Sequence, residues 1–264
     1  MMILLLTILA VLACPMVLFQ AGAASAEVAG AEPAGDYAVL LHGLGRTAIS
    51  MKGLERHLKR QGYRVVNVAY PSKRFSVEYL SDVCLQGMLE KRISDPAARI
   101  HFVTHSLGGI ILRRYLSCHH LENLGRVVML APPNQGSEII DRLKTCALIR
   151  KVLGPAMLEL GTGPDDFPGR LGPVHFECGV IAGDRSLNPF LSRLLPGPND
   201  GKVTVASTWV PGVQDSLVLH STHTWMMWRE RTLRQTALFL RSGHFDQPAL
   251  PKGHHGQAVM TPMC

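Results

Sequence analysis

Three polar residues of this 264-residue chain have the types and the order that nucleophilic catalysis requires. Ser106 stands in the segment Thr-His-Ser-Leu-Gly-Gly at positions 104–109, Asp200 in Pro-Asn-Asp-Gly at 198–201, and His223 follows an apolar run. A serine hydroxyl attacks a carbonyl carbon only when a base takes its proton, and a carboxylate holds that base in place. Ser106, Asp200 and His223 are therefore candidates for a nucleophile, an acid and a base, while Asn-Asp-Gly taken alone is an ordinary turn sequence.

The surroundings of Ser106 favour a sharp turn from a buried strand into a helix, the arrangement called a nucleophile elbow. Such a turn requires small residues two positions on either side of the serine, because strand and helix nearly touch there. Gly108 meets this requirement, whereas Thr104 stands where a glycine is usual. A serine between a strand and a helix can also be a helix cap. The two glycines at 108 and 109 favour the elbow.

Other residues could take the same roles. Asp184, after the apolar run 176–182, is the alternative acid, and Asp215 is a third candidate. His220 precedes His223 by three positions and could exchange roles with it. His105 neighbours the nucleophile, but successive side chains at an elbow diverge, so we expect it to shape the pocket. Asn134, in the segment 131–137 that follows a predicted strand, is also expected to line the pocket; a helix cap at Ser137 is compatible with this.

Positioning these residues requires a sheet, and the chain supplies an alternation of strand and helix patterns. Apolar runs predict strands at 37–41, 63–69, 100–103, 126–130 and 176–182. Helical spacing of apolar residues covers 49–60, 77–93 and 110–117 between them. This alternation predicts an α/β fold with a mostly parallel sheet and helices on both faces, whose carboxyl edge gathers the functional residues.

The second half of the sequence is less regular. Residues 137–160 are helical but interrupted at Gly154-Pro155, and 161–173 are rich in Gly, Pro and Asp, which predicts a cap over the pocket at 137–173. Short strands are expected at 202–207 and 216–220, and a long closing helix at 224–241, with residues 226–228 in the core or facing lipid. We expect one domain over 27–243 and an irregular tail over 244–264.

Three segments together resemble a bacterial lipase or esterase of the α/β-hydrolase superfamily over residues 37–243. They are Leu-His-Gly-Leu-Gly at 41–45, the Ser106 segment, and Asn-Asp-Gly-Lys-Val at 199–203. The resemblance implies that the backbone N–H groups of Leu44 and Leu107 form the oxyanion hole, with His42 beside the pocket. It also implies hydrolysis of an acyl ester or lipid through an acyl-enzyme, without a cofactor or metal. The same triad serves acyltransferases and thioesterases, and an inactive binding protein of this fold is the alternative outside enzymes.

The N-terminal segment predicts an exported protein, periplasmic or secreted. Residues 1–26 have no charged side chain, and their apolar run over 2–19 predicts a signal peptide cleaved after Ala26 or, alternatively, a membrane anchor. Five cysteines follow; an oxidising compartment would permit one or two disulfides among them, and the odd number leaves at least one thiol free or bonded elsewhere. The net charge of +7 is scattered, which favours a solvated surface, with association to a membrane surface as an alternative and no nucleic acid as a partner.

Overall fold

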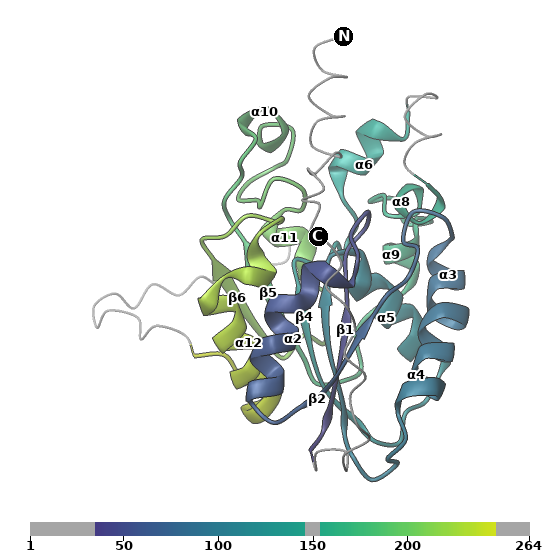
Figure 1. Cartoon of the computed structure of the whole chain (residues 1–264). Helices are drawn as coiled ribbons and strands as arrows, with labels where there is room; N and C mark the ends of the chain where they lie inside the picture. The colour runs from purple at the N-terminus through teal and green to yellow at the C-terminus, as the bar shows by residue number, and fades with distance from the viewer. Residues whose placement is uncertain (1–34, 146–153, 247–264) are drawn as a thin grey trace, which may run out of the picture.

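The chain forms one six-stranded parallel sheet (Figure 1). The structure is a computed structural model and describes residues 35–145 and 154–246. The strands stand in the order β2-β1-β3-β4-β5-β6, and every neighbouring pair is parallel. Their bounds are β1 Tyr37–Leu41, β2 Arg64–Val68, β3 Ile100–His105, β4 Leu124–Leu130, β5 Cys178–Gly183 and β6 Asp215–Leu219. All six carboxyl ends therefore meet at one edge, as the sequence predicts.

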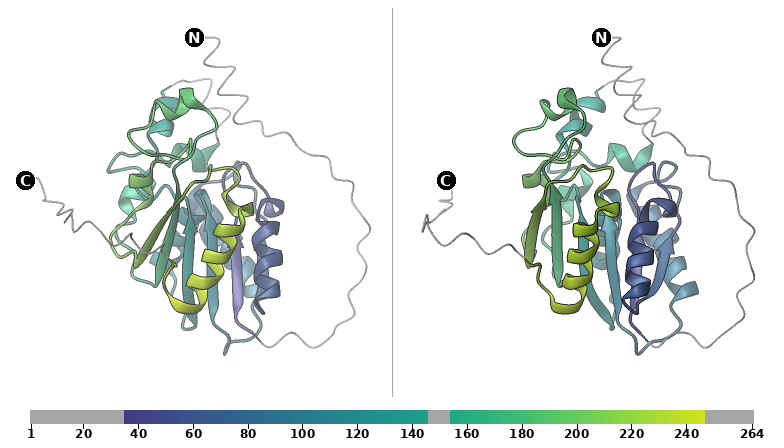
Figure 2. Two further views of the ribbon diagram at one scale, coloured as in Figure 1. Left: turned by 90° about the vertical axis from the view of Figure 1, so that its left-hand side faces the viewer. Right: turned by 60° about the vertical axis from the view of Figure 1, so that its left-hand side comes forward.

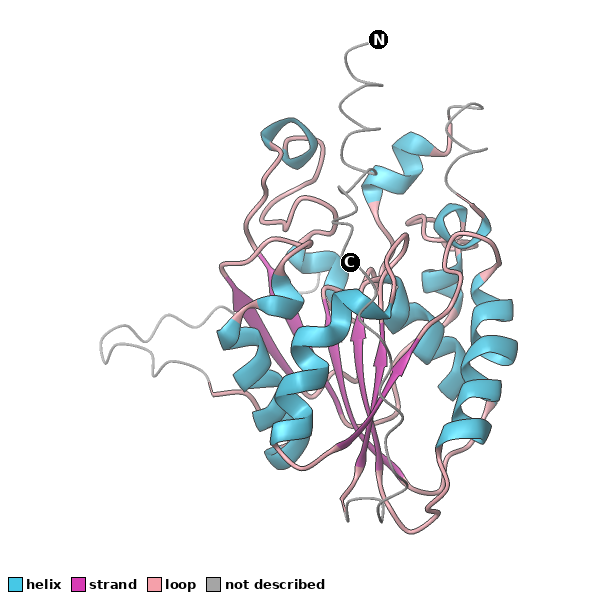
Figure 3. Cartoon of the chain, viewed as in Figure 1, coloured by secondary structure: helices cyan, strands magenta, loops and turns pink. Residues whose placement is uncertain are grey.

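Helices cover both faces of the sheet (Figure 3). On one face lie η1 (Ala48–Met51), α2 (Lys52–Arg60), η3 (Met226–Trp228) and α12 (Glu230–Ser242). On the other face lie α3 (Val77–Tyr79), η2 (Leu80–Leu85), α4 (Gln86–Arg92) and α5 (Leu107–Cys118). Side chains of β1 alternate between the two cores, with Val39 and Leu41 in one and Leu40 in the other. This alternation follows from the two-residue period of a strand.

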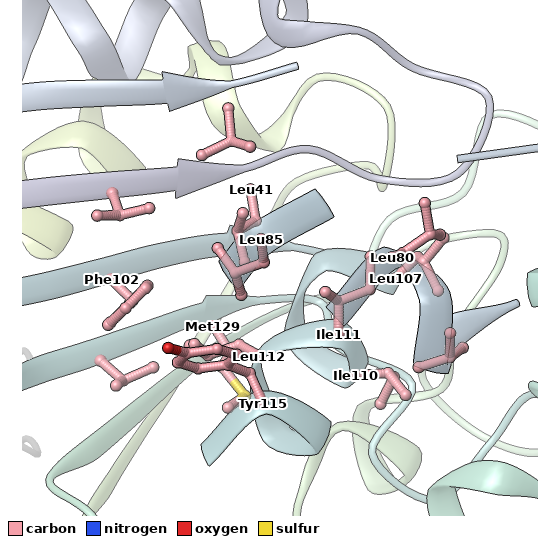
Figure 4. Close-up of a cluster of buried hydrophobic side chains, with 14 of the residues drawn as sticks. Leu41, Leu80, Leu85, Phe102, Leu107, Ile110, Ile111, Leu112, Tyr115 and Met129 are labelled. Carbon is pink, nitrogen blue, oxygen red and sulfur yellow. The ribbon is translucent and has the colours of Figure 1, made fainter. Parts of the chain in front are cut away.

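The helix that follows Ser106 is the most deeply buried helix of the sheet's second face. Its residues Leu107, Ile110 and Ile111 are completely buried (Figure 4). They pack with strand side chains such as Phe102 and with Leu80 of η2 in one cluster. Burying each of these side chains stabilises the fold by about 1.5–3 kcal/mol, so α5 is held firmly where it leaves the sheet.

Short helices lie beyond the carboxyl edge of the sheet (Figure 2). They are α6 (Glu138–Leu143), α8 (Pro155–Leu158), α9 (Phe167–Arg170), α10 (Pro189–Ser192) and α11 (Val205–Thr208). The first three belong to the predicted cap segment 137–173, of which residues 146–153 lie outside the described part. The predicted signal segment and residues 247–264 of the predicted tail also lie outside it, whereas Phe245 at the start of the tail is buried in the core. Within the described residues, no helix has both the length and the apolar character to cross a membrane.

Two expectations for the second half of the chain are wrong. Residues 202–207 do not form a strand: Thr204 makes one bridge with Asn199, and α11 begins directly after it. The Thr204 hydroxyl accepts the backbone N–H of Ser207 at 3.0 Å, which caps the helix. The expected helix 224–241 is broken at Arg229, whose backbone is extended, so that η3 and α12 are separate.

Candidate active site

Ser106 occupies a strained backbone position between β3 and α5. Its φ of +52° and ψ of −122° are rarely adopted by residues other than glycine and cost on the order of 1–3 kcal/mol. Hydrogen bonds hold it there, since its N–H donates to Leu130 O at 2.9 Å and its carbonyl accepts the Gly109 N–H at 2.9 Å. Its side chain makes no capping bond to α5. The local geometry is therefore that of an elbow and differs from that of a helix cap.

Small residues allow the elbow to approach the neighbouring strands. A Cβ atom on Gly108 would lie 2.6 Å from Leu41 O, and one on Gly109 would lie 3.3 Å from Thr104 Oγ1. Thr104, which replaces the usual glycine, is thus accommodated because the residue facing it has no side chain. A methyl group at position 109 would make a tight contact with Thr104 Oγ1.

The segment after β1 lies beside the nucleophile. A Cβ atom on Gly43 would lie 3.2 Å from Ser106 Cβ and 2.8 Å from His105 Nδ1, so the backbone of this segment is close to the serine. Leu44 follows at the turn and is half-buried, and Leu107 is the first residue of α5 and fully buried. Of the two residues whose N–H groups are expected to hold an oxyanion, Leu107 directly follows Ser106 in the chain and Leu44 directly follows Gly43, which lies close to it.

Asp200 and His223 form a buried pair. His223 Nδ1 lies 2.7 Å from Asp200 Oδ2, and the side chains are 5% and 1% exposed. The other carboxylate oxygen, Oδ1, accepts the N–H groups of Lys202 at 3.0 Å and Val203 at 2.9 Å. The carboxylate is therefore held in one orientation, and it accepts the proton of Nδ1, which leaves the Nε2 lone pair of a neutral His223 available to take a proton.

The loop that carries Asp200 fits closely against the end of β5. Any Cβ atom on Gly183 would meet Ser221 O and would lie 2.9 Å from Asp200 Cβ. In addition, the backbone N–H of His223 donates to Asp200 O at 3.2 Å. The loops after β5 and β6 are thus locked together by main-chain contacts as well as by the side-chain pair.

His105 contacts His223 directly. Its Nε2 lies 3.0 Å from the His223 carbonyl oxygen, and the two ring centroids are 4.8 Å apart. Because a carbonyl only accepts, Nε2 carries the proton. Burial, followed by the neighbouring His223, holds the pKa of His105 well below its usual value, so the ring is neutral at pH 7. His105 links the nucleophile turn to the base.

His42 is a second buried, neutral imidazole. Its Nδ1 donates to Gly43 O at 2.9 Å, and its ring stacks on Tyr70 with centroids 4.0 Å apart. Burial lowers the pKa of His42 to about 4. Tyr70, which is not among the residues predicted from the sequence, donates its hydroxyl proton to His42 O. Its position just after β2, beside the end of β1, is the signal that could have identified it.

The remaining candidates lie elsewhere. His220 Nδ1 and Asp184 Oδ1 form a separate pair at 3.0 Å, with side chains 72% and 35% exposed. Asp215 begins β6, at the opposite edge of the sheet, and accepts the N–H of Phe245 at 2.7 Å. The Asp184–His220 pair lies at the carboxyl edge of the sheet, as Ser106 does, but it is open to solvent.

Asn134 is engaged in structural hydrogen bonds. Its amide nitrogen donates to Thr208 O at 2.8 Å, and its side-chain and backbone oxygens accept from Arg113 Nη1. Arg113 is a buried cation on α5 that also donates to Gly172 O at 2.5 Å, and burial lowers its pKa to about 10. Asn134 and Arg113 thus join α5 to the loops after β4 and α9. The signal for these contacts in the sequence is Arg113 itself, a charged residue on the otherwise apolar side of the helix pattern.

Cys84, Cys118 and Cys178 are free thiols, so the part of the chain that the structure covers contains no disulfide. Cys146 and Cys264 lie outside that part. No group of three or more His, Cys, Asp or Glu side chains among the described residues is arranged to hold a metal ion.

Comparisons with known proteins agree with this architecture. Residues 38–254 match the profile of a family described as the alpha/beta hydrolase family. No curated protein sequence gives a significant match. Among solved structures, the mature lipase BlEst2 of Bacillus licheniformis is similar with a TM-score of 0.63 and 18% identity, over 81% of this chain and 94% of that chain.

Two further solved structures share the fold. A carboxyl esterase of metagenomic origin has a TM-score of 0.58 and 21% identity, over 74% of this chain and 66% of that chain. The phospholipase PlaB of Legionella pneumophila, in complex with thio-NAD, has a TM-score of 0.55 and 21% identity, over 66% of this chain and 44% of that chain. At these identities the likeness concerns the fold.

Proposed function

Since the chain belongs to the alpha/beta hydrolase family, we propose that it is a serine hydrolase of carboxylic esters, with Ser106, His223 and Asp200 as its catalytic triad. The observation that carries the proposal is the combination of a strained serine at an elbow with a buried histidine–carboxylate pair at the same sheet edge. The solved lipase and carboxyl esterase of this fold support the substrate class.

In the proposed reaction, Ser106 Oγ attacks the ester carbonyl carbon while His223 Nε2 takes the hydroxyl proton. Asp200 stabilises the imidazolium that forms and keeps Nδ1–H directed at its own carboxylate. The carbonyl oxygen becomes an oxyanion, which the N–H groups of Leu44 and Leu107 stabilise by about 3 kcal/mol each. The intermediate collapses when His223 returns the proton to the leaving alcohol, and water then releases the acyl group by the same route.

Burial favours this assignment over the pair formed by Asp184 and His220. A carboxylate withdrawn from water stabilises the developing imidazolium much more strongly than one that is screened by solvent. Asp200 is 1% exposed and receives two backbone N–H bonds, whereas His220 is 72% exposed. In addition, His105, which precedes the nucleophile, bonds to the backbone of His223. We therefore assign the base to His223.

The test is hydrolysis of p-nitrophenyl esters from acetate to palmitate by the full chain, with Ser106→Ala alongside. Loss of the nucleophile should reduce kcat on the order of 10⁴-fold or more. Ser117→Ala, which removes an exposed hydroxyl from the far end of α5, is the matched control and should retain full activity.

The acyl-length profile then distinguishes an esterase from a lipase. Turnover that persists in Ser106→Ala would contradict the proposal. If neither protein hydrolyses any ester but Ser106 is labelled by a fluorophosphonate, acyl transfer or thioester hydrolysis by the same triad becomes the better assignment.

A further inference from the structure

An open hollow of about 470 Å³ lies close to the loop that carries His223, at the carboxyl edge of the sheet. Three segments build it: the loop after β5, the loop after β6, and the end of η3 with the residue that follows it. Its lining residues are Arg185, Leu187, Thr222, Trp225, Trp228 and Arg229. Thr222 is the neighbour of His223 in the chain, so the hollow adjoins the proposed site.

Large apolar side chains line this hollow while remaining open to water. Trp225 is 52% exposed, Leu187 is 65% exposed and Trp228 is 39% exposed. The neighbouring Met226 and Met227 are completely buried. Residues 226–228 therefore do not form one apolar face: the two methionines belong to the core, and Trp228 is partly exposed. Exposed apolar side chains that gather in one place mark a contact surface.

Positive charge surrounds these aromatic rings. Arg185 and Arg229 are exposed, and within the described residues neither guanidinium has an ion-pair partner. The acidic neighbours in the chain are already engaged, since Asp184 pairs with His220 and Glu230 with Arg234. A third guanidinium, that of Arg56, lies 5.9 Å from the ring centroid of Trp228. The hollow therefore presents cations that the protein itself does not neutralise.

We propose that this hollow is the surface by which the protein docks on an anionic phospholipid bilayer. Tryptophan rings settle at the level of lipid headgroups, where one part of the ring is apolar and the N–H meets water. Arginine guanidinium groups bind phosphate oxygens by paired hydrogen bonds. Leu187 and the two tryptophans enter the interface, and Arg185 and Arg229 bind the phosphates around them.

The docking surface goes beyond the proposed function and does not depend on it, because it involves none of the triad residues. It would nevertheless serve that function. The lining loops follow β5 and β6, which also carry the loops of Asp200 and His223. A bilayer held against the hollow lies at the same sheet edge as Ser106.

The experiment uses the three tryptophans of the chain as local reporters. Full-length variants that retain only Trp209, only Trp225 or only Trp228, with phenylalanine at the other two positions, are mixed with phosphatidylglycerol vesicles that carry brominated acyl chains. Bromine quenches an indole only when the ring enters the bilayer. Trp209 is 49% exposed and does not line the hollow, so it is the matched control.

We expect strong quenching of Trp225 and Trp228 and none of Trp209. Because the readout is local, attachment of the chain through its apolar N-terminal residues would not imitate this pattern. Quenching of Trp209 equal to that of the other two, or absence of quenching at Trp225 and Trp228, would overturn the proposal. Circular dichroism shows whether each variant keeps the fold, and the exposed Trp225→Phe change can be tested alone if the double replacements unfold.

Charge is tested with Arg185→Gln and Arg229→Gln in the variant that retains Trp225. Each change should raise about fivefold the amount of anionic lipid needed for half-maximal quenching. Arg92→Gln removes the same charge from the end of α4 on the other face of the sheet and should have no effect. Equal quenching on brominated phosphatidylcholine, or no effect of either arginine, would contradict an anionic bilayer as the partner.

Discussion

At the scale of residues, the chain contains two Asp–His pairs at the same edge of the sheet. Asp200 and His223 are withdrawn from water, and Asp184 and His220 are not. The energetic difference is large, because the attraction between a carboxylate and an imidazolium weakens as the surroundings become more polar. Substitutions in the two pairs can therefore be compared within one protein.

Asp200→Asn should reduce kcat for ester hydrolysis about 10⁴-fold, as expected when a histidine loses the acceptor that fixes its tautomer. Asp184→Asn should leave the rate essentially unchanged, because its partner is exposed. Steady-state kinetics on one soluble ester compares the two variants directly. A large loss with Asp184→Asn and a small one with Asp200→Asn would transfer the acid role to the exposed pair.

The types of the proposed triad residues could be identified from sequence, because chain order and small neighbours are local signals. The partners of the pocket candidates His42 and Asn134 could not. Tyr70 reaches His42 from the segment after β2, and Arg113 reaches Asn134 and Gly172 across the fold, so both contacts depend on tertiary packing. The difference in burial that supports His223 over His220 as the proposed base is also a tertiary property. The sequence, in which the two histidines lie three positions apart, does not show it.

At the scale of elements, the elbow depends on how closely α5 approaches β1. Gly108→Ala places a methyl group 2.6 Å from Leu41 O, a backbone atom that cannot move aside. We expect a loss of about 1–3 kcal/mol in the free energy of unfolding and lower activity, since Ser106 would shift. Gly87→Ala, in α4 with open space around it, should instead stabilise by about 1 kcal/mol. Urea unfolding measures both, and equal effects would contradict this account.

Strands and helices were predicted correctly where one pattern extends over the whole element. The prediction failed where a single residue determines the local structure, by a side-chain cap or by its backbone conformation. The apolar runs of β1 to β5 and the spacing of α2 and α5 indicate their structures correctly. Residues 202–207 have strand-like composition, but the Thr204 hydroxyl closes a helical turn instead. Arg229 interrupts the last helix by adopting an extended backbone, which no helix-breaking residue announces.

At the scale of the whole molecule, the buried imidazole of His42 couples folding to pH. Its pKa is about 4 in the folded chain and about 6.5 in the unfolded chain. Between these two values, the unfolded chain binds a proton at His42 and the folded chain does not. Stability is therefore lost as pH falls from 6.5 towards 4, by about 2 kcal/mol at pH 5.

His42→Phe keeps a ring against Tyr70 but cannot titrate. Urea unfolding at pH 7 and pH 5 should show a smaller loss of stability in this variant than in the natural protein. The carboxylates of the chain contribute the same slope to both proteins and cancel in the comparison. An identical pH dependence would show that His42 does not titrate as described.

The division of the proposed triad along the chain has a consequence for biosynthesis. The elbow and the segment beside it come from β1 and β3, in the first half, whereas Asp200 and His223 come from loops near the end. While a ribosome is still making the chain, the strained serine can form but has no base. If the proposed triad is right, a nascent or truncated chain that ends before the loop after β6 has no base for Ser106 and should not cleave esters.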